Sequence, residues 1–464
     1  MIDKIVSVAN SIIWSPALVA LLVGAGLYFS IRTRFVQVRR FGLMIRSLFA
    51  PKEKSEEGSK HGISSFEAFC VALSGRVGTG NIVGVATAIA LGGPGAVFWM
   101  WLIAFFGAST AFVESTLAQK YKFHHATGFR GGPASYIEKG LKLPWLGIVF
   151  SVCCIFGYGL FLAPVQSNGM TGALSNSFGI NPLYSGLALA FLLALVIIGG
   201  IKSISRVASI ITPFMALGYL VITVIVLAHN INTIPHVLKM IVTSAIGLQQ
   251  VAGGILGSTI MMGVKRGIFS NEAGQGGGAI VSASAAVSHP AKQGLAQAFS
   301  VYVDTLLICT ATALMILCSG TYNILDAKTG EILVAGDPSL GANYVGYTQA
   351  AVDSVLSGFG STFVSIAMVF FVFTTIMAYY FYGESSIMHI FEGKKAGSEK
   401  LAIWIFRFAL LAMVVFGSVR EANVIWTLGD VGVGLTAWIN VIALLLLCPE
   451  AVNLLRDYEK SLKQ

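Results

Sequence analysis

Long apolar stretches, separated by short polar segments, run along almost the whole chain. A helix of about 17 to 25 predominantly apolar residues is long enough to cross the hydrocarbon layer of a membrane. Eleven stretches reach this length approximately: 12–31, 63–90, 95–119, 144–176, 183–199, 204–228, 239–263, 293–318, 353–388, 401–417 and 422–447. The pattern predicts an all-α integral membrane protein with about 11 transmembrane helices.

The composition supports this class of protein. Of the 464 residues, 55% are hydrophobic and only 11% are charged, which is far from the balance of a soluble domain. No HExxH, GxSxG or P-loop pattern is present. The glycine spacing of residues 78–84 does not fit a dinucleotide-binding loop, and it lies inside an apolar stretch rather than after a strand. The sequence therefore predicts neither an enzyme nor an organic cofactor.

The basic residues indicate how the helices are oriented. If the N-terminus lies outside the cell, 24 of the 30 lysines and arginines fall on the cytoplasmic side, as the positive-inside rule expects. An odd number of spans then leaves the basic C-terminal tail, residues 448–464, in the cytoplasm. The net charge of +9 thus reflects orientation in the cell membrane and contact with anionic lipid, and it does not indicate nucleic-acid binding.

Two polar, glycine-rich interruptions stand out inside the apolar stretches. They cover residues 74–81, SGRVGTGN, and residues 252–258, AGGILGS. A helix break at membrane depth leaves backbone groups that lipid cannot satisfy, so it persists only where it faces protein, ions or water. Breaks at matching positions in two halves of a chain are typical of transporters with inverted repeats. An ion channel is the alternative, but no TVGYG-like filter or ring of charged residues is evident.

The spans after the first fall into two groups of five that enter the membrane from opposite sides. The first predicted repeat covers residues 63–228 and the second residues 239–447, and each begins with a span that contains an interruption. One extra helix and a basic cytoplasmic loop, residues 1–62, precede them. The glycine-rich residues 267–278 would form a turn or gate on the cytoplasmic side. The arrangement predicts a five-plus-five inverted repeat whose two breaks meet near the bilayer centre.

A long motif at residues 92–107, GGPGAVFWMWLIAFFG, resembles the signature of the alanine or glycine:cation symporter family, also called sodium:alanine symporters. Shorter matches extend the likeness over nearly the whole chain: residues 77–81, 130–133, 269–274 and 373–375. The resemblance implies a LeuT-type fold with one extra first helix, and sodium-coupled symport of alanine, glycine or both by alternating access. Where many members carry a Gly-Trp pair, residues 377–384 read MAYYFYGE, so glutamine or another neutral amino acid stays open as the substrate.

The predicted substrate site uses the backbone of both interruptions. A zwitterionic amino acid carries two charges, and a buried site must satisfy both without leaving an unpaired charge of its own. Free N–H groups at the start of a half-helix would bind the carboxylate, and free carbonyls at the other interruption would accept from the ammonium. An amide of the fourth span, Gln166 or Asn168, could add a contact or simply join two helices. The substrate-binding candidates are Gly78, Thr79, Gly80, Asn81, Gln166, Ala252, Gly253 and Gly254.

The resemblance also implies a sodium site. Sodium needs oxygen ligands, and hydroxyls and carbonyls supply them without a fixed charge. By analogy with the cation site of LeuT-type transporters, the predicted ligands are the hydroxyls of Thr374 and Thr375 and the carbonyls of Ser74, Val77 and Phe371. The alternative for either threonine is a hydrogen bond to a carbonyl of its own helix. Coupling to protons in place of sodium stays open.

Five ionisable residues lie inside predicted spans, where an unpaired charge costs several kcal/mol. They are Glu67, Arg76, Glu114, Asp304 and Glu384. A carboxylate such as Asp304 or Glu67 could pair with Arg76 and hold or gate the first interruption. The sequence decides neither this partner nor the oligomeric state.

Overall fold

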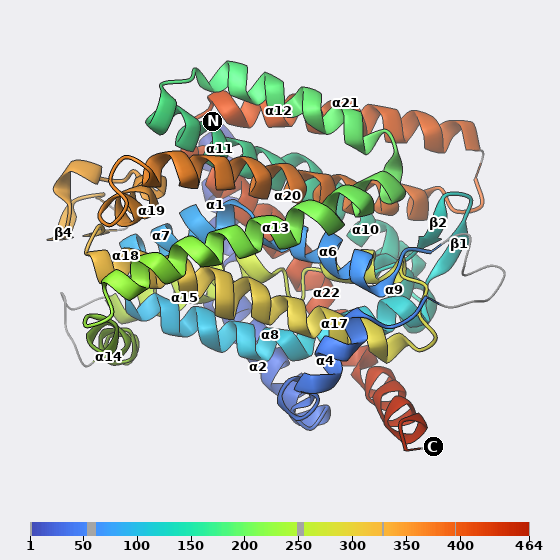
Figure 1. The fold of residues 1–464 in the computed structure, drawn as a ribbon. Coiled ribbons are helices and arrows are strands. Elements are labelled where there is room, and N and C mark those ends of the chain that lie inside the picture. The colour runs from blue at the N-terminus through green and yellow to red at the C-terminus, as the bar shows by residue number, and fades with distance from the viewer. Residues whose placement is uncertain (1, 53–61, 248–254, 327–328, 395, 464) are drawn as a thin grey trace.

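The computed structural model describes residues 2–52, 62–247, 255–326, 329–394 and 396–463, and the chain is mostly helical there (Figure 1). The helical elements are α1 (Ile2–Ile13), α2 (Pro16–Arg32), α3 (Val36–Arg39), α4 (Phe41–Leu48), α6 (Ser65–Arg76), η1 (Gly80–Gly84), α7 (Val85–Gly92), α8 (Gly95–Lys120), α9 (Pro133–Leu141), α10 (Pro144–Cys154), η2 (Ile155–Leu162), α11 (Ala163–Phe178), α12 (Pro182–Ile197), α13 (Gly200–His229), α14 (Ile234–Ala245), α15 (Ile255–Asn271), α16 (Gly277–Ala283), α17 (Pro290–Val301), η3 (Tyr302–Cys309), α18 (Thr310–Ser319), η4 (Pro338–Leu340), α19 (Tyr344–Asp353), α20 (Gly360–Ile390), α21 (Ala396–Val419) and α22 (Ala422–Ser461). There are also two antiparallel hairpins, in which β1 (Phe123–His125) pairs with β2 (Gly128–Arg130) and β3 (Asn323–Leu325) pairs with β4 (Ile332–Ala335).

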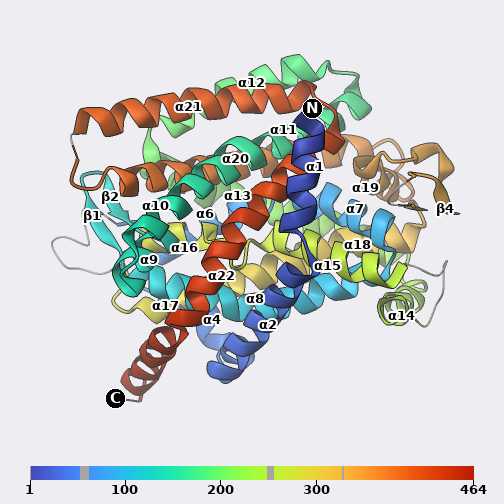
Figure 2. The ribbon, with the colours of Figure 1, turned by 180° about the vertical axis from the view of Figure 1, so that it is seen from behind.

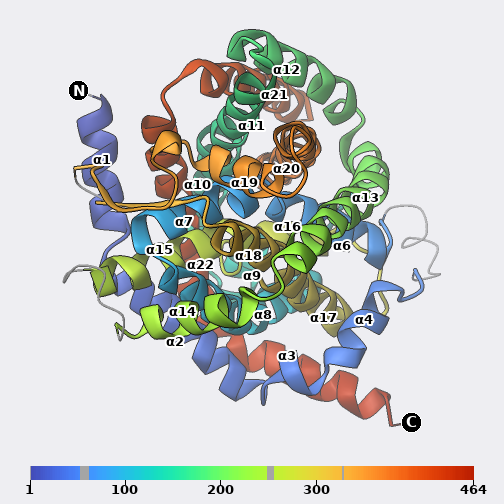
Figure 3. The ribbon, with the colours of Figure 1, turned by 60° about the vertical axis from the view of Figure 1, so that its left-hand side comes forward.

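The long helices run roughly along one direction and give the molecule two distinct ends (Figure 1). The β3–β4 hairpin, α14 and α19 gather at one end, whereas the β1–β2 hairpin, α9 and the C-terminal end of α22 lie at the other. Seen from behind, α22 and the α1–α2 pair cross one face of the bundle (Figure 2). A view turned by 60° shows α12 and α21 side by side at the periphery, where both pack against α11 (Figure 3).

The helices fit a protein that crosses the membrane several times. Within the described residues, seven helices are long and apolar enough to span a membrane, or up to nine if each of two bent pairs counts as one span. The bent pairs cover residues 6–32, with a bend of 42°, and residues 65–92, with a bend of 51°. The apolar helix α12 has 16 residues and falls just short, and α15, with 17 residues, is not among these spans. The predicted number of about 11 spans is therefore not confirmed.

Large apolar side chains face outwards along the peripheral helices. Phe191 on α12, Phe214 on α13 and Phe408 on α21 are 64%, 70% and 65% exposed, respectively. In water such side chains would form an unfavourable apolar surface, whereas lipid chains solvate them without cost. These three helices therefore form part of the surface that faces the membrane.

The predicted span 239–263 is not one helix, which is a correction to the hydropathy pattern. The short helix α14 ends at Ala245, and α15 begins only at Ile255. Gly257 and Ser258, which close the second predicted interruption, lie inside α15. Ile255 and Leu256 also lie inside α15, whereas the substrate candidates Ala252, Gly253 and Gly254 lie outside the described residues.

A second buried break does exist, but it lies further along the chain. Helix α15 ends at Asn271 and α16 begins at Gly277, so the break falls in the segment predicted to be a cytoplasmic turn. Gly274 and Gly276 have φ angles of 84° and 97°, which only glycine adopts at low cost. The apolar run after residue 277 then continues as a helix. This segment is therefore a break between two half-helices, and residues 268–278 are all buried.

Candidate functional site

The first interruption is a helix break between α6 and α7, as the sequence predicted. A capping box between Ser64 and Glu67 starts α6, so Glu67 serves the N-terminus of that helix. The helix ends at Arg76, Val77 follows in an extended conformation (φ −80°, ψ 90°), and helical structure resumes at Gly80. The whole interruption is buried. Its free backbone groups therefore face protein rather than lipid, as a break at membrane depth requires.

The second break satisfies some of its backbone groups with its own side chains. Asn271 Oδ1 accepts a hydrogen bond from Ala273 N at 3.0 Å, and Gln275 Nε2 donates to Ile268 O at 2.6 Å. The last carbonyls of a helix have no partner within the helix, so bonds of this kind stabilise its end. The carbonyl of Asn271 has another partner, which comes from the first break.

Arg76 joins the two breaks. Its Nε donates to the backbone carbonyl of Asn271 at 2.6 Å. Its Nη1 donates to two side chains of α17, namely Gln297 Oε1 at 3.1 Å and the hydroxyl of Ser300. The guanidinium is 2% exposed, so neutral oxygens take the place of water around it. The partner of Arg76 is thus the backbone and polar side chains, and not Asp304 or Glu67 as the sequence suggested.

Asp304 on η3 is surrounded by neutral hydrogen-bond donors. Its carboxylate accepts from Asn81 Nδ2 at 2.7 Å, from Ser270 Oγ at 2.9 Å and from Thr305 Oγ1 at 2.6 Å. Through its Oδ1, Asn81 also accepts from the N–H of Gly78 at 2.8 Å. The cluster therefore ties the first break to α15 and η3, and Asn81 caps the free backbone of the break.

Three backbone carbonyls converge on the hydroxyl of Thr375, which lies on α20. The Thr375 Oγ1 is 2.8 Å from Ser74 O and 3.1 Å from Val77 O, both at the end of α6, and 2.8 Å from Phe371 O in its own helix. All four residues are buried. One hydroxyl and three carbonyls form an uncharged oxygen cage of the kind that a small hard cation prefers. The structure thus brings together four of the five predicted sodium ligands.

Thr374 points elsewhere. Its hydroxyl donates to Phe370 O at 2.9 Å and to Phe371 O at 3.1 Å within α20, and it lies 3.7 Å from Met215 Sδ on α13. This is the hydrogen bond to its own helix that membrane threonines commonly form. Thr374 therefore touches the cage only through the carbonyl of Phe371.

Gln166 on α11 lies against the first break. Its Oε1 accepts from the N–H of Thr79 at 2.8 Å, and its Nε2 lies 3.4 Å from the hydroxyl of Tyr379. The N–H of Thr79, which was predicted to bind a substrate carboxylate, thus donates to the side-chain oxygen of Gln166 on a neighbouring helix. Asn168 donates instead to two backbone carbonyls at the end of α21, at 2.9 and 2.8 Å. It therefore joins two helices, which was the alternative to a contact with the substrate.

Aromatic side chains flank the breaks on two sides. The rings of Tyr158, Tyr379 and Tyr382 lie within 4.8 to 5.9 Å of one another, between η2 and α20. On another side, Phe269 lies 5.1 Å from Trp426 of α22. The two tyrosines of α20 belong to the segment MAYYFYGE that departs from the family pattern, which was the available signal. No pattern pointed to Trp426.

A buried ionic cluster lies beside the second aromatic pair. Asp430 on α22 accepts from Lys265 Nζ at 2.6 Å and from Arg266 Nη2 at 2.8 Å. The Arg266 guanidinium also lies over the ring of Trp426, 4.9 Å from its centroid, which favours the buried cation. Lys265 and Arg266 are therefore not cytoplasmic loop residues as the hydropathy pattern implied, because Asp430 neutralises part of their charge inside the bundle.

Of the other two ionisable residues, Glu384 lies away from both breaks, whereas Glu114 lies beside the second, where its partner Asn440 also donates to Gly274 O at 2.9 Å. Glu384 near the end of α20 accepts from the hydroxyl of Tyr380 at 2.6 Å and lies 3.7 Å from Arg130 Nη2 and 3.9 Å from Arg407 Nη2. Glu114 on α8 accepts from Asn440 Nδ2 at 3.1 Å. Both therefore have polar partners inside the bundle, and neither contributes an atom to the oxygen cage.

Comparisons of the sequence with known proteins find a matching family and several similar proteins. The family model described as "Sodium:alanine symporter family" matches residues 1–464. The "Sodium/proton-dependent alanine carrier protein" of Bacillus sp. (strain PS3) is 45% identical over 413 residues, which are 88% of this chain and 91% of the relative. The "Probable sodium/glutamine symporter GlnT" of Bacillus subtilis (strain 168) is 42% identical over 463 residues, which are 100% of this chain and 92% of the relative.

A solved structure shares the fold. It is described as the substrate-bound outward-open state of a Na+-coupled sialic acid symporter, and it aligns with a TM-score of 0.51 over 96% of this chain and 85% of that chain. The sequence identity is 13%, so the likeness concerns the fold alone.

Proposed function

Because the chain belongs to the sodium:alanine symporter family, we propose that it carries alanine or glycine into the cell together with sodium, by alternating access. The observation that carries this proposal is the oxygen cage around Thr375, which bridges the first helix break and α20. A carrier that couples two solutes needs an ion site whose occupation changes the structure of the substrate site. The cage meets this need, because two of its carbonyls belong to the break itself.

Sodium would bind within this cage. The Thr375 hydroxyl and the carbonyls of Ser74, Val77 and Phe371 would supply oxygen ligands, and the bound ion would fix the end of α6 against α20. Thr374 would act next to the cage, since it shares the carbonyl of Phe371. Binding of the ion would thereby order the break before the substrate binds.

The substrate carboxylate would bind the N–H groups of Thr79 and Gly80, in the place that Gln166 Oε1 takes at Thr79, while Gly78 keeps its bond to Asn81. Gln166 would then turn to the substrate. The ammonium would bind carbonyls in the last turn of α15, those of Phe269 and Ser270, because a helix end leaves such groups without a partner in the helix. A Cβ placed on Gly80 would lie 3.1 Å from the Phe269 ring and 3.5 Å from Ser270 Cα, so the two elements adjoin. The ammonium candidates of the second glycine-rich interruption, Ala252, Gly253 and Gly254, remain predictions from the sequence.

The proposed topology has 11 spans if α12 and the α15–α16 pair are added to the nine candidates. The two repeats would cover residues 63–228 and 239–447, with the N-terminus outside the cell and the tail from residue 448 in the cytoplasm. Each repeat would then contain one broken helix, α6–α7 in the first and α15–α16 in the second.

Two alternatives for the cargo stay within the same mechanism. A relative that is 42% identical is named for sodium and glutamine, and another that is 45% identical is named for sodium, protons and alanine. The aromatic residues Tyr379 and Tyr382 beside the break could set the size of side chain that the site admits. An ion channel would instead equilibrate its solute without coupling.

Uptake of labelled alanine, glycine and glutamine into proteoliposomes tests the proposal. Each is measured with an inward sodium gradient, an inward proton gradient, or neither. One cation that enters down about 100 mV gains about 2.3 kcal/mol, and a tenfold gradient adds about 1.4, enough for roughly 500-fold accumulation of a neutral amino acid. We expect uphill accumulation of alanine or glycine that requires sodium. Equilibration that ignores both gradients would instead indicate a channel or uniporter.

Gln166→Leu is expected to raise the KM for alanine about tenfold, because it removes one hydrogen bond at the break, worth about 1 to 2 kcal/mol. The sodium dependence should change much less. Concentration series of alanine at saturating sodium measure the KM.

Asn168→Leu is the matched control, since Asn168 lies two residues away on the same helix but bonds carbonyls of α21. It should leave the KM for alanine within about twofold of the original protein. An equal rise in the KM of both variants would show that Gln166 acts through helix packing and not through the substrate.

A further inference from the structure

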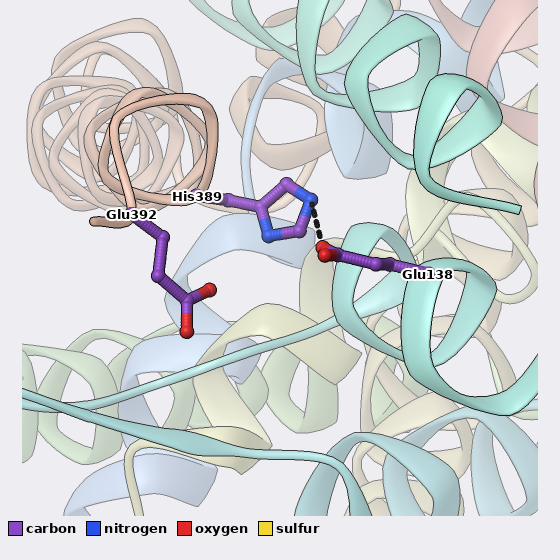
Figure 4. A group of neighbouring side chains, drawn as sticks. All are labelled: Glu138, His389 and Glu392. Atoms are coloured by element: carbon purple, nitrogen blue, oxygen red, sulfur yellow. Dashed lines mark ion pairs between the residues drawn. The ribbon is translucent and has the colours of Figure 1, made fainter. Parts of the chain in front are cut away.

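Three side chains that commonly bind metals gather away from the two breaks, at the end of the molecule where α9 meets the end of α20. They are Glu138 of α9, His389 in the last turn of α20, and Glu392 just beyond it. One ligand atom from each lies within 4.8 Å of the other two. Figure 4 shows the imidazole ring between the two carboxylates. The three residues come from two separate elements, so the fold and not a local motif brings them together.

The fold holds the imidazole in place. The side chain of His389 is only 4% exposed, and its Nε2 lies 3.2 Å from Glu138 Oε2. A Cβ placed on Gly147 of α10 would lie 3.3 Å from the same nitrogen, so α10 covers the ring closely. The other nitrogen, Nδ1, is buried and has no hydrogen-bond partner within the described residues.

Ordinary ion pairing explains only part of this arrangement. Glu138 can pair with His389, and Lys139 Nζ lies 3.5 Å from Glu392 Oε1. Two separate pairs would give no reason for a second carboxylate beside the ring. The Lys139 ammonium is also engaged with Phe123, whose ring centroid is 5.0 Å away. The Lys139 ammonium therefore keeps its contact with the Phe123 ring when Glu392 binds another partner.

We propose that Glu138, His389 and Glu392 bind a zinc ion, with water in the fourth position. One imidazole nitrogen and two carboxylate oxygens are a donor set that suits Zn²⁺, with ligand distances of about 2.0 to 2.2 Å. Two ligands of a tetrahedral ion then lie about 3.4 Å apart, and Glu138 and His389 already have nearly this separation at 3.2 Å. Glu392 completes the site by a small movement, since its side chain is 40% exposed and follows the end of the helix.

The zinc ion would tie α9 to α20. Helix α20 also carries Thr375 of the proposed sodium site, so a link at its end restrains a helix that must move relative to α6 in each transport cycle. Zinc should therefore slow transport reversibly. This consequence rests on the proposed function, whereas the binding of zinc does not.

Zinc binding is tested on the full-length protein in detergent by competition with a chromophoric zinc chelator. We expect one site per chain, and His389→Gln should weaken it about tenfold or more. Glu138→Gln should weaken it as well, which guards against a folding defect of a single variant. Lys139→Met should tighten binding severalfold, because it removes the cation that competes for Glu392. His236→Gln, which alters an exposed histidine on α14, is the matched control and should change nothing.

Binding that is equal in the original protein and in His389→Gln, or that His236→Gln alone weakens, would show an adventitious ion only and overturn the site. The consequence for transport is tested by alanine uptake into proteoliposomes with zinc added to either face. We expect severalfold inhibition from one face that EDTA reverses and that His389→Gln lacks. Uninhibited uptake by a protein that binds zinc would overturn the restraint on α20. Absence of alanine uptake without zinc would contradict the proposed function and leave the binding result intact.

Discussion

Thr375→Val is expected to raise the sodium concentration for half-maximal alanine uptake by roughly 30-fold or more. Valine has the shape of threonine, but it removes the hydroxyl that lies within 3.1 Å of Ser74 O, Val77 O and Phe371 O. A methyl group then points at three buried carbonyls and at the proposed sodium ion. Loss of an oxygen ligand and of these bonds costs about 2 to 3 kcal/mol, which corresponds to the stated change. Initial rates of alanine uptake into proteoliposomes over a range of sodium concentrations measure it.

Thr374→Val is the matched control, because it makes the same change one residue earlier. The Thr374 hydroxyl bonds carbonyls of its own helix, so we expect a shift of only about threefold. Thr375→Ser keeps the hydroxyl and should restore most of the sodium affinity. An equal, large effect of both valine variants would place both hydroxyls at the ion, as the family resemblance implies. Unchanged sodium dependence in Thr375→Val would exclude the oxygen cage as the sodium site.

The first break and the cage were accessible from the sequence, for two different reasons. A run of polar and glycine residues within an apolar stretch has few explanations in a membrane, so residues 74–81 could be assigned to a break directly. The Thr375 cage could be predicted only through the resemblance, since a threonine pair in an apolar helix is not distinctive in itself. The structure brings the Thr375 hydroxyl and its three carbonyls together, and the binding of sodium there stays a prediction.

The second break shows where hydropathy alone is insufficient. Two glycine-rich segments, residues 252–258 and 272–278, lie about 20 residues apart, and both could interrupt the same apolar stretch. The pattern favoured the first segment because the second follows the basic pair Lys265 and Arg266. The structure buries that pair against Asp430, more than 160 residues later in the chain. A charge that is neutralised by a distant residue leaves no local signal, so the end of the span was placed too early.

The number of spans is limited by a related difficulty. Hydropathy measures how apolar a segment is, but not whether it forms one helix or two. The stretch 239–263 has the composition of one span, yet it contains the end of α14 and the start of α15. Conversely, α12 is an apolar helix, but its 16 residues are slightly too few for a membrane span. The helical, multi-pass class of the protein therefore follows from composition, while the exact spans depend on tertiary structure.

The partner of Arg76 could not be predicted, because it is not a carboxylate. A charge inside the membrane is expected to pair with an opposite charge, and the sequence left Asp304 and Glu67 open as partners. In the structure, Nε and Nη1 of Arg76 donate instead to the carbonyl of Asn271 and to two neutral side chains of α17. A backbone carbonyl is available at every residue, so its role depends on where the second break lies. This contact couples the two breaks, and it makes Arg76 the residue whose loss should disturb both.

Arg76→Met is expected to reduce alanine uptake about 100-fold or more at any sodium concentration. Methionine fills part of the volume, but it leaves the Asn271 carbonyl and the Gln297 side chain without the guanidinium, at a cost of about 1.5 to 3 kcal/mol for each hydrogen bond to a charged group. The two breaks would then no longer be held together. Uptake per folded transporter, with the amount of folded protein determined by size-exclusion chromatography, measures the loss.

Arg407→Met controls for the removal of a buried arginine, since Arg407 donates to Tyr380 and contacts neither break. It should reduce thermal stability but leave most of the uptake per folded transporter. Arg76→Lys keeps the charge and cannot reproduce the fork of donors, so it should retain only a fraction of the activity. If Arg76→Met transported alanine as well as Arg407→Met does, Arg76 would only stabilise the bundle. The expected order of activity, Arg407→Met above Arg76→Lys above Arg76→Met, instead requires that the contact between the two breaks takes part in transport.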